Sequence, residues 1–200
     1  MNNALKLHKI SVSEMDNNCY LLCAGDEALL IDASADAPAL LSLAADHGVK
    51  ITAVLTTHRH WDHVRALKEV LNETGAVHYS SFLDAPALPA PVDVELEHGD
   101  TLPFAGYDLP VIILRGHTPG GAAIAADIDG VTNIFVGDSL FPGGVGKTTS
   151  EGDFVRLYKD VTQRLFDVYP DEAIVRPGHG APTTLGAERP HMDEWWERRW

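Results

Sequence analysis

The chain has 200 residues, 45% of them hydrophobic and 22% charged, a composition that predicts one globular domain, 1–200, with a substantial buried core. A balance of 29 acidic against 15 basic residues gives a net charge of −14, which argues against a nucleic-acid partner and against an anionic membrane surface. We find no apolar run near the roughly 20 residues that span a bilayer and no secretory signal, so we expect a cytoplasmic protein without membrane contact.

The first half of the chain alternates between strand-like and helix-like patterns. The predicted elements are strands at 5–12, 19–24 and 28–32, a helix at 34–47, a strand at 51–55 and a helix at 64–74. The segment Gly25-Asp26-Glu27 is typical of a hairpin turn between the second and third strands. Cys19 and Cys23 both fall on the second strand, roughly 13 Å apart, which is too far for a disulfide bond.

The second half begins with a proline-rich connection, 85–93, and then continues the alternation. Its predicted elements are strands at 109–114, 122–126 and 131–136, a helix from 153 to 168, a strand at 173–175 and a terminal helix at 188–200. Asp153 is the expected cap of the first of these helices. Trp195, Trp196 and Trp200 are expected to pack the terminal helix on the sheet. This order of elements predicts sheets with helices outside them.

Seven histidine and aspartate residues fall in loops that follow predicted strands. They are His58, His60, Asp62, His63, His117, Asp138 and His179. Neutral imidazole and carboxylate are ligands that zinc prefers, and iron and manganese accept them too. So many ligands, each beside a glycine, a proline or a turn, indicate two metal ions in one site and therefore a hydrolytic enzyme.

The spacing of these residues allows two ions to share them. His58 and His60 are two residues apart and point the same way in an extended chain, so both can reach one ion. Asp62 and His63 lie where the chain turns and can reach a second ion. Asp138 can bridge the ions because a carboxylate has two oxygens.

Together these motifs resemble metallo-β-lactamase-fold hydrolases, and within them the glyoxalase II-like (hydroxyacylglutathione hydrolase-like) branch. The segments that carry the resemblance are 15–22, 57–63, 116–120, 137–141 and 177–180. The resemblance implies an α+β fold, the four-layer αββα sandwich. It implies one metal site of His58, His60 and His117, a second site of Asp62, His63 and His179, and Asp138 as the bridge. It also implies that a metal-bridging hydroxide attacks the carbonyl carbon of a thioester or ester, with Asp62 as the catalytic residue that orients the hydroxide.

The chain also departs from this branch. Few residues follow His179, so we expect a short form without the branch's C-terminal helical domain, and the thiol carrier of the substrate stays open. Lys147 lies where the family places a basic residue against the substrate, and it is the expected substrate-binding residue. The leading function is therefore a thioesterase acting on a small acyl-thiol or ester, with two Zn²⁺ ions, or iron or manganese in their place. A homodimer is left open.

Three other functions compete with the thioesterase. A persulfide dioxygenase needs, by resemblance, one iron on residues matching His58, His117 and Asp138, and a lactonase uses the same ligand set as the thioesterase. The third is a metal-binding interaction protein without catalysis. The remaining histidines are expected to be structural or solvated. Gly146-Lys147-Thr148 resembles the end of a phosphate-binding loop, but Phe141 stands where that loop requires glycine, which excludes nucleotide binding.

Overall fold

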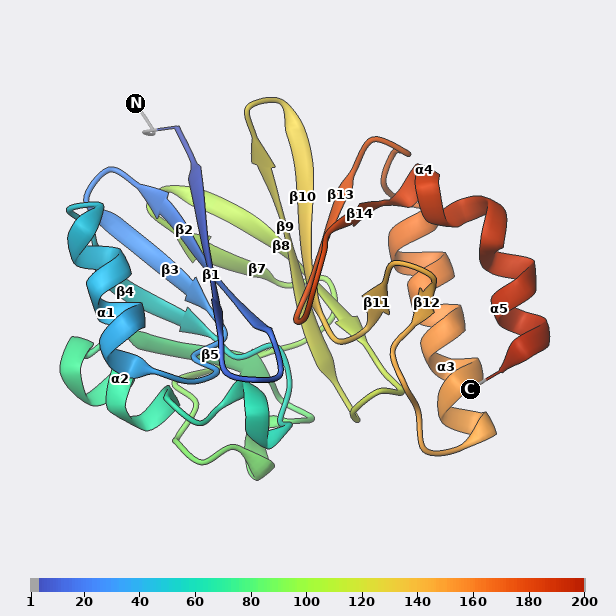
Figure 1. The fold of residues 1–200 in the computed structure, drawn as a ribbon, viewed down its shortest axis with the longest axis horizontal. Helices are drawn as coiled ribbons and strands as arrows, with labels where there is room; N and C mark the ends of the chain where they lie inside the picture. The colour runs from blue at the N-terminus through green and yellow to red at the C-terminus, as the bar shows by residue number, and fades with distance from the viewer. Residues whose placement is uncertain (1–3, 200) are drawn as a thin grey trace.

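The structure, a computed structural model, describes residues 4–199 and contains two six-stranded sheets (Figure 1). The first sheet consists, in spatial order, of β1 (Lys6–Val12), β2 (Asn17–Ala24), β3 (Glu27–Ile31), β4 (Lys50–Leu55), β5 (Val77–Ser81) and β6 (Val94–Leu96). The second consists, in spatial order, of β14 (Thr183–Thr184), β13 (Ile174–Pro177), β10 (Val131–Gly137), β9 (Gly121–Ile128), β8 (Tyr107–Leu114) and β7 (Thr101–Phe104). A small additional sheet pairs β11 (Leu140–Phe141) with β12 (Gly144–Val145).

Helices cover the outer face of each sheet (Figure 1). The helices are α1 (Ala37–Asp46) and α2 (Leu67–Thr74) on the first sheet, and α3 (Glu151–Val161), α4 (Leu185–Glu188) and α5 (Met192–Arg198) on the second. Three apolar cores separate the resulting four layers, one between the sheets and one under each helix layer. The α+β, four-layer αββα sandwich expected from the sequence is therefore confirmed.

Strand β2 shows how the sequence pattern produces these layers. Successive side chains of a strand point to opposite faces. Accordingly, Tyr20 and Leu22 belong to the core between the sheets, whereas Cys19 and Leu21 belong to the core under α1 and α2. Both faces of β2 are covered, so all 8 of its residues are buried, which explains its nearly unbroken apolar run.

Parallel strands direct several loops to the same edge of the sandwich. Strands β3, β4, β5 and β6 run parallel to one another, and β10 runs parallel to β13. Parallel strands end at the same edge of a sheet, so the loops that follow β3 and β4 lie together, as do those that follow β10 and β13. Ala122 N donates to Thr57 O at 2.7 Å, a bond that joins the loop after β4 to the opposite sheet.

Six strands were not expected from the sequence, namely β5, β6 and β7 and the two-residue strands β11, β12 and β14. Strand β5 has the unpromising sequence Val-His-Tyr-Ser-Ser, with polar residues at buried positions. Those polar groups are paired: His78 Nε2 lies 2.8 Å from Thr56 Oγ1, and Ser80 Oγ donates to Thr56 O at 3.0 Å. Burial of hydrogen-bonded polar side chains therefore hid this strand from the hydrophobic pattern.

Several helix boundaries differ from the sequence-based expectation. The helix expected at 34–47 is α1, which begins at Ala37, and the terminal helix expected at 188–200 is divided into α4, a 3₁₀ turn at Arg189–His191 and α5. The helix expected from residue 64 begins at Leu67, because Trp61–His63 form a separate 3₁₀ turn. The cap of α3 is Ser150 rather than Asp153, since Ser150 Oγ accepts from Asp153 N at 3.1 Å, and α3 continues into a π-helix at Thr162–Phe166.

The terminal tryptophans pack against the outer helix layer. Trp195 is 2% exposed and lies edge-on to Phe166, and Trp196 contacts Tyr158 of α3. Trp200 lies outside the described residues. Within residues 4–199, no helix is long and apolar enough to cross a membrane.

Candidate metal centre

All seven predicted ligand residues meet at the edge where the parallel strands end. His58 and His60 follow β4, with Asp62 and His63 in the 3₁₀ turn just after them. His117 lies in the turn between β8 and β9, Asp138 directly follows β10, and His179 closely follows β13. The structure thus brings these distant residues together at short separations.

The seven side chains form two groups of three around a central carboxylate. The ligating atoms of His58, His60 and His117 lie within 4.8 Å of one another, as do those of Asp62, His63 and His179. Asp138 reaches both groups: its Oδ2 is 3.7 Å from His117 Nε2 and 3.3 Å from His179 Nε2. This is the position required of a bridging carboxylate.

Hydrogen bonds on the outer side of the rings turn four imidazoles toward the centre. Each of these rings has its Nδ1 against an oxygen of the protein, so its Nε2 is left to face inward. The four contacts are His58 Nδ1 to Thr57 Oγ1 at 3.0 Å, His63 Nδ1 to Asp32 Oδ2 at 2.9 Å, His117 Nδ1 to Lys147 O at 2.6 Å and His179 Nδ1 to Met15 O at 2.8 Å. This arrangement is typical of metal-binding histidines, whose outer nitrogen is fixed by an acceptor.

Three buried polar atoms of the cluster have no hydrogen-bond partner. They are Nε2 of His58, Nε2 of His117 and Oδ1 of Asp138. Buried polar atoms are nearly always paired, because an unpaired one costs about 1–3 kcal/mol. Inward-facing lone pairs of imidazole and carboxylate match divalent transition metals, so the donor set suits two such ions.

The ionisable groups of the cluster perturb one another strongly. Burial would raise the pKa of Asp138, but its close contacts with the imidazoles of His179 and His63 hold that pKa well below its ordinary range. Burial lowers the pKa of His63, yet its contacts with the carboxylates of Asp138 and Asp32 outweigh burial and raise it to about 10. Burial and the neighbouring His63 hold the pKa of His58 well below its usual value. The carboxylates therefore favour protonation of the histidines beside them, and a bound cation would replace those protons.

Asp32 is a functional residue that the sequence analysis missed. Its Oδ1 accepts from Thr57 N at 2.7 Å, and its Oδ2 accepts from Thr57 Oγ1 at 2.7 Å as well as lying against His63. Both oxygens are thus occupied, so Asp32 positions the loop and His63 rather than offering a ligand. The signal available in the sequence was an aspartate at the end of a predicted buried strand. The structure adds that this aspartate has a left-handed φ of 61°, which is strained for a residue other than glycine.

Two further buried polar side chains, one at the start of β2 and one in the loop after β5, hold the remaining parts of the site. Asn17 Nδ2 donates to Asp62 Oδ2 at 2.9 Å. Asp84, fully buried, accepts from Arg59 N and from Gly120 N, each at 3.1 Å, and so ties the histidine loop to the turn that carries His117. Asn17 lies in the segment 15–22 that carried the family resemblance, but the sequence analysis assigned it no role, and Asp84 stood in no motif.

Close approach explains the glycine before His179. A Cβ on Gly178 would lie 2.2 Å from Asp138 Oδ1 and 2.7 Å from His63 Cε1, so any larger residue would displace the cluster.

The sequence analysis assigned Lys147 to substrate binding. Its carbonyl braces His117 and its side chain is exposed, while the anchoring role of its ammonium stays a prediction. Trp61, between two predicted ligands, is 61% exposed, with the Arg65 guanidinium 4.8 Å above its ring.

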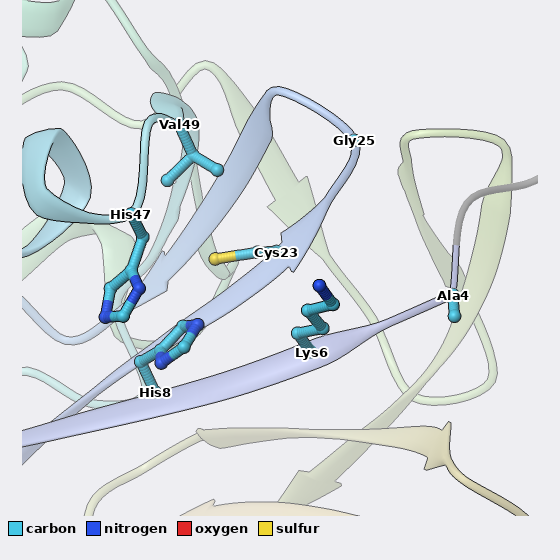
Figure 2. A pocket seen from close by; sticks show the side chains of 7 residues that line it. All are labelled: Ala4, Lys6, His8, Cys23, Gly25, His47 and Val49. Atoms are coloured by element: carbon cyan, nitrogen blue, oxygen red, sulfur yellow. The ribbon is translucent and has the colours of Figure 1, made fainter.

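A second group of histidines lies apart from this cluster. His8 and His47 stack with ring centroids 3.4 Å apart beside a cavity of about 450 Å³, into which Lys6 and Cys23 also project (Figure 2). Burial and the nearby His47 and Lys6 lower the pKa of His8. Among the described residues, these side chains form no group of three ligating atoms, in contrast to the loop edge.

Comparison with known proteins places this geometry in a family. The profile of the Metallo-beta-lactamase superfamily matches residues 12–197. The chain is 35% identical to a hydroxyacylglutathione hydrolase of Fuscovulum blasticum over 82% of its own length, and it spans 62% of that enzyme. It is 28% identical to the hydroxyacylglutathione hydrolase GloC of Haemophilus influenzae, over 92% of this chain and 95% of GloC.

Solved structures share the fold over nearly the whole chain. The di-iron-bound form of TTHA1623 is 31% identical, with a TM-score of 0.75 over 91% of this chain and 96% of that one. ETHE1 from Myxococcus xanthus is 27% identical, with a TM-score of 0.82 over 95% of this chain and 84% of that one. With its two groups of ligands, its four layers and a match over most of its length, the chain belongs to the metallo-beta-lactamase superfamily, and its relatives are consistent with the glyoxalase II-like branch.

Proposed function

We propose that the protein is a metal-dependent hydrolase of glyoxalase II type that cleaves a small acyl-thiol, with two divalent ions as its cofactors and Zn²⁺ as the expected metal. The observation that carries this proposal is the cage of donors, in which outer hydrogen bonds turn four imidazole Nε2 atoms toward Asp138. Relatives named hydroxyacylglutathione hydrolase support the choice of a thioester over other acyl substrates.

The grouping of the side chains supports a specific assignment of ligands. His58, His60 and His117 would hold one ion, Asp62, His63 and His179 the other, and Asp138 would bind both. The chemistry supplied by ions held on these residues would be a lower pKa for a water, toward about 7, and stabilisation of negative charge on the carbonyl oxygen of the substrate.

Two residues of the chain would act on the reactants. Asn17 fixes one carboxylate oxygen of Asp62, and we assign to this carboxylate the orientation of the attacking water through a hydrogen bond. A thiolate leaves readily, so the protein needs no strong general acid at the other side. Lys147, on the loop that braces His117, would bind a negative group of the substrate.

A panel of substrates tests this proposal. Protein prepared without chelator is assayed on thioesters and on lactones, then stripped of metal and reloaded with Zn²⁺, while His78→Asn serves as a variant of a buried histidine outside the cluster. We expect thioester cleavage that is lost on stripping and restored by Zn²⁺, and no comparable loss in the control. Full turnover by the stripped protein, or inactivity of the reloaded protein on every thioester, would refute the proposal.

A second candidate is an iron-dependent persulfide dioxygenase. It is supported by the similarity to ETHE1 from Myxococcus xanthus, and the di-iron-bound form of TTHA1623 indicates that iron is a candidate metal for either function. The two candidates differ in a measurable way, because the dioxygenase consumes oxygen and the hydrolase does not. Oxygen uptake on a persulfide by the iron-loaded protein, without thioester cleavage, would replace the hydrolase with this second function.

A further inference from the structure

A cavity of about 670 Å³ opens beside the three-histidine end of the candidate metal centre. His60 and His117 form part of its wall, so a molecule in this cavity would lie directly against the reacting atoms. The opposite walls come from the segment after β5, which contributes Phe82, and from α3, which contributes Arg156. Its position makes it the natural place for the part of the substrate that extends beyond the scissile bond.

Three arginines converge on this cavity in a protein whose net charge is −14. The guanidinium of Arg115 is already paired, because its Nε and Nη2 donate to Asp160 at 2.8 Å each. Among residues 4–199, the ion pair recorded for Arg156 is a 3.6 Å contact with Asp153, whose carboxylate also accepts from Ser150 Oγ at 2.7 Å. This leaves Arg156 weakly engaged.

The backbone of Arg59 is fixed by a hydrogen bond, whereas its guanidinium has no ion-pair partner among the described residues. Its N–H donates to Asp84 at 3.1 Å, which fixes the residue between two of the candidate ligands. Within the described residues, no carboxylate lies within ion-pair distance of its exposed guanidinium. A planar guanidinium of this kind is suited to bind a carboxylate or a phosphate through two parallel hydrogen bonds.

The rest of the wall is apolar. Phe82 is 42% exposed, and Leu83 and Pro119 line the cavity next to it. Since the overall negative charge repels anions, a local group of arginines beside the reaction centre would be needed to admit one. The cavity therefore matches a ligand with a short apolar part and a negatively charged group.

We propose that Arg59 and Arg156 form an anion clamp that selects thioesters with a carboxylate or phosphate in the part of the substrate remote from the scissile bond. Phe82 would contact the apolar segment between that anion and the thioester. This inference rests on the proposed hydrolase function and specifies its substrate class. Arg59 and Arg156 are specificity residues that act on substrate binding, and they have no part in holding the metal ions.

The test compares three thioesters of one acyl group, on glutathione (carboxylates), coenzyme A (phosphates) and N-acetylcysteamine (uncharged). The variants are Arg59→Ala, Arg156→Ala and the charge-preserving Arg59→Lys. Lys68→Ala on α2 removes one exposed positive charge away from the cavity and controls for net charge. Metal content and melting temperature of every variant verify that the site and fold are retained.

We expect Arg59→Ala to lower kcat/KM for a charged thioester, relative to the uncharged one, by roughly ten- to hundredfold, mostly through KM. Arg156→Ala should lower this ratio less, Arg59→Lys should restore part of it, and Lys68→Ala should leave it unchanged. Loss confined to the glutathione thioester identifies a carboxylate as the ligand, and loss confined to the coenzyme A thioester identifies a phosphate. An equal effect on charged and uncharged thioesters, or an effect no larger than that of Lys68→Ala, would overturn the clamp.

Equilibrium binding separates this inference from the hydrolase proposal. Calorimetry measures the affinity of the free thiols, glutathione and coenzyme A, for the wild type and for Arg59→Ala without any turnover. Weaker binding to the variant supports the clamp even if no thioester is cleaved, in which case only the hydrolase proposal fails. Equal binding to both proteins, together with active cleavage of the uncharged thioester, would refute the clamp and leave the hydrolase proposal standing.

Discussion

The two halves of the candidate metal centre contain different types of ionisable side chain. The half of His58, His60 and His117 contains only imidazoles, whereas the half of Asp62, His63 and His179 includes a carboxylate and has Asp32 behind it. Burial is the largest influence on His58 and His60 and lowers the pKa of both. In the other half, Asp138 raises the pKa of His179, and contacts with the carboxylates of Asp138 and Asp32 outweigh burial and raise the pKa of His63. One loop edge thus combines a neutral half with an anionic half, and Asp138 belongs to both.

The largest effect is expected from removing the shared carboxylate. In Asp138→Ala, both halves lose their common oxygen donor, so we expect both ions to be bound far more weakly and nearly all hydrolytic activity to disappear. Metal titration and kinetics on the same preparation measure the two effects. Asp108→Ala, an exposed aspartate on β8, is the matched control. Retention of two ions and full turnover by Asp138→Ala would show that the halves are not joined by this residue.

Asp32→Asn should weaken metal binding in the two halves unequally. The substitution keeps the shape of the side chain but removes the charge that lies 2.9 Å from His63 Nδ1. Loss of an outer partner of a ligating histidine typically costs 10–100-fold in affinity, so we expect a loss of about this size for the ion beside His63. The other ion should lose less, because Asp32 reaches His58 only through Thr57 Oγ1. Equal weakening of both ions in a two-site titration would contradict the distinction between the halves.

The ligands were predictable from the sequence and most of their supports were not. The seven ligand positions stand in compact motifs, three of them next to a glycine, and convergence follows from strands that end at one edge. Asn17, Asp32 and Asp84 each act through a contact with a residue at least 25 positions away. No local spacing encodes such contacts, because they depend on the register between loops that only the folded chain brings together.

The fold was predictable to a similar extent. Strongly apolar strands such as β2 and β4 stood out from their surroundings, whereas β5 did not, because its buried Ser80 and His78 look like exposed polar residues. Their partner is Thr56, at the end of a neighbouring strand. Tertiary hydrogen bonds therefore determined the missing strand, and the hydrophobic pattern alone had no information about them.

Proton release on metal binding should reveal the same asymmetry. The pKa of His63, about 10, means that this residue carries a proton at pH 7 without metal, and a cation must displace it. His58 and His60, with lowered pKa values, are already neutral and release none. Affinity for the ion of the anionic half should therefore fall as pH falls, while the other ion changes less. Calorimetry in buffers of different ionisation enthalpy counts the protons, and equal release by both ions would contradict the assignment.

The smallest effect is expected from Lys147→Ala. The carbonyl that braces His117 belongs to the backbone, so the substitution should leave both ions in place. If the ammonium anchors the substrate, KM rises while kcat changes little. Steady-state kinetics with metal analysis of the same sample provide the measurement. An unchanged KM would remove Lys147 from substrate binding, and loss of an ion would show that the loop, rather than the ammonium, was disturbed.

The most direct test of a two-metal centre in this protein is anomalous X-ray diffraction from crystals of chelator-free protein, combined with elemental analysis of the same material. We expect two anomalous peaks per chain, one among His58, His60 and His117 and one among Asp62, His63 and His179, both in contact with Asp138. The spacing of the peaks should be about 3.5–4 Å, as in other two-metal sites. Absence of both peaks in protein exposed to excess Zn²⁺ would contradict the central claim that these loops form a cage for two cations.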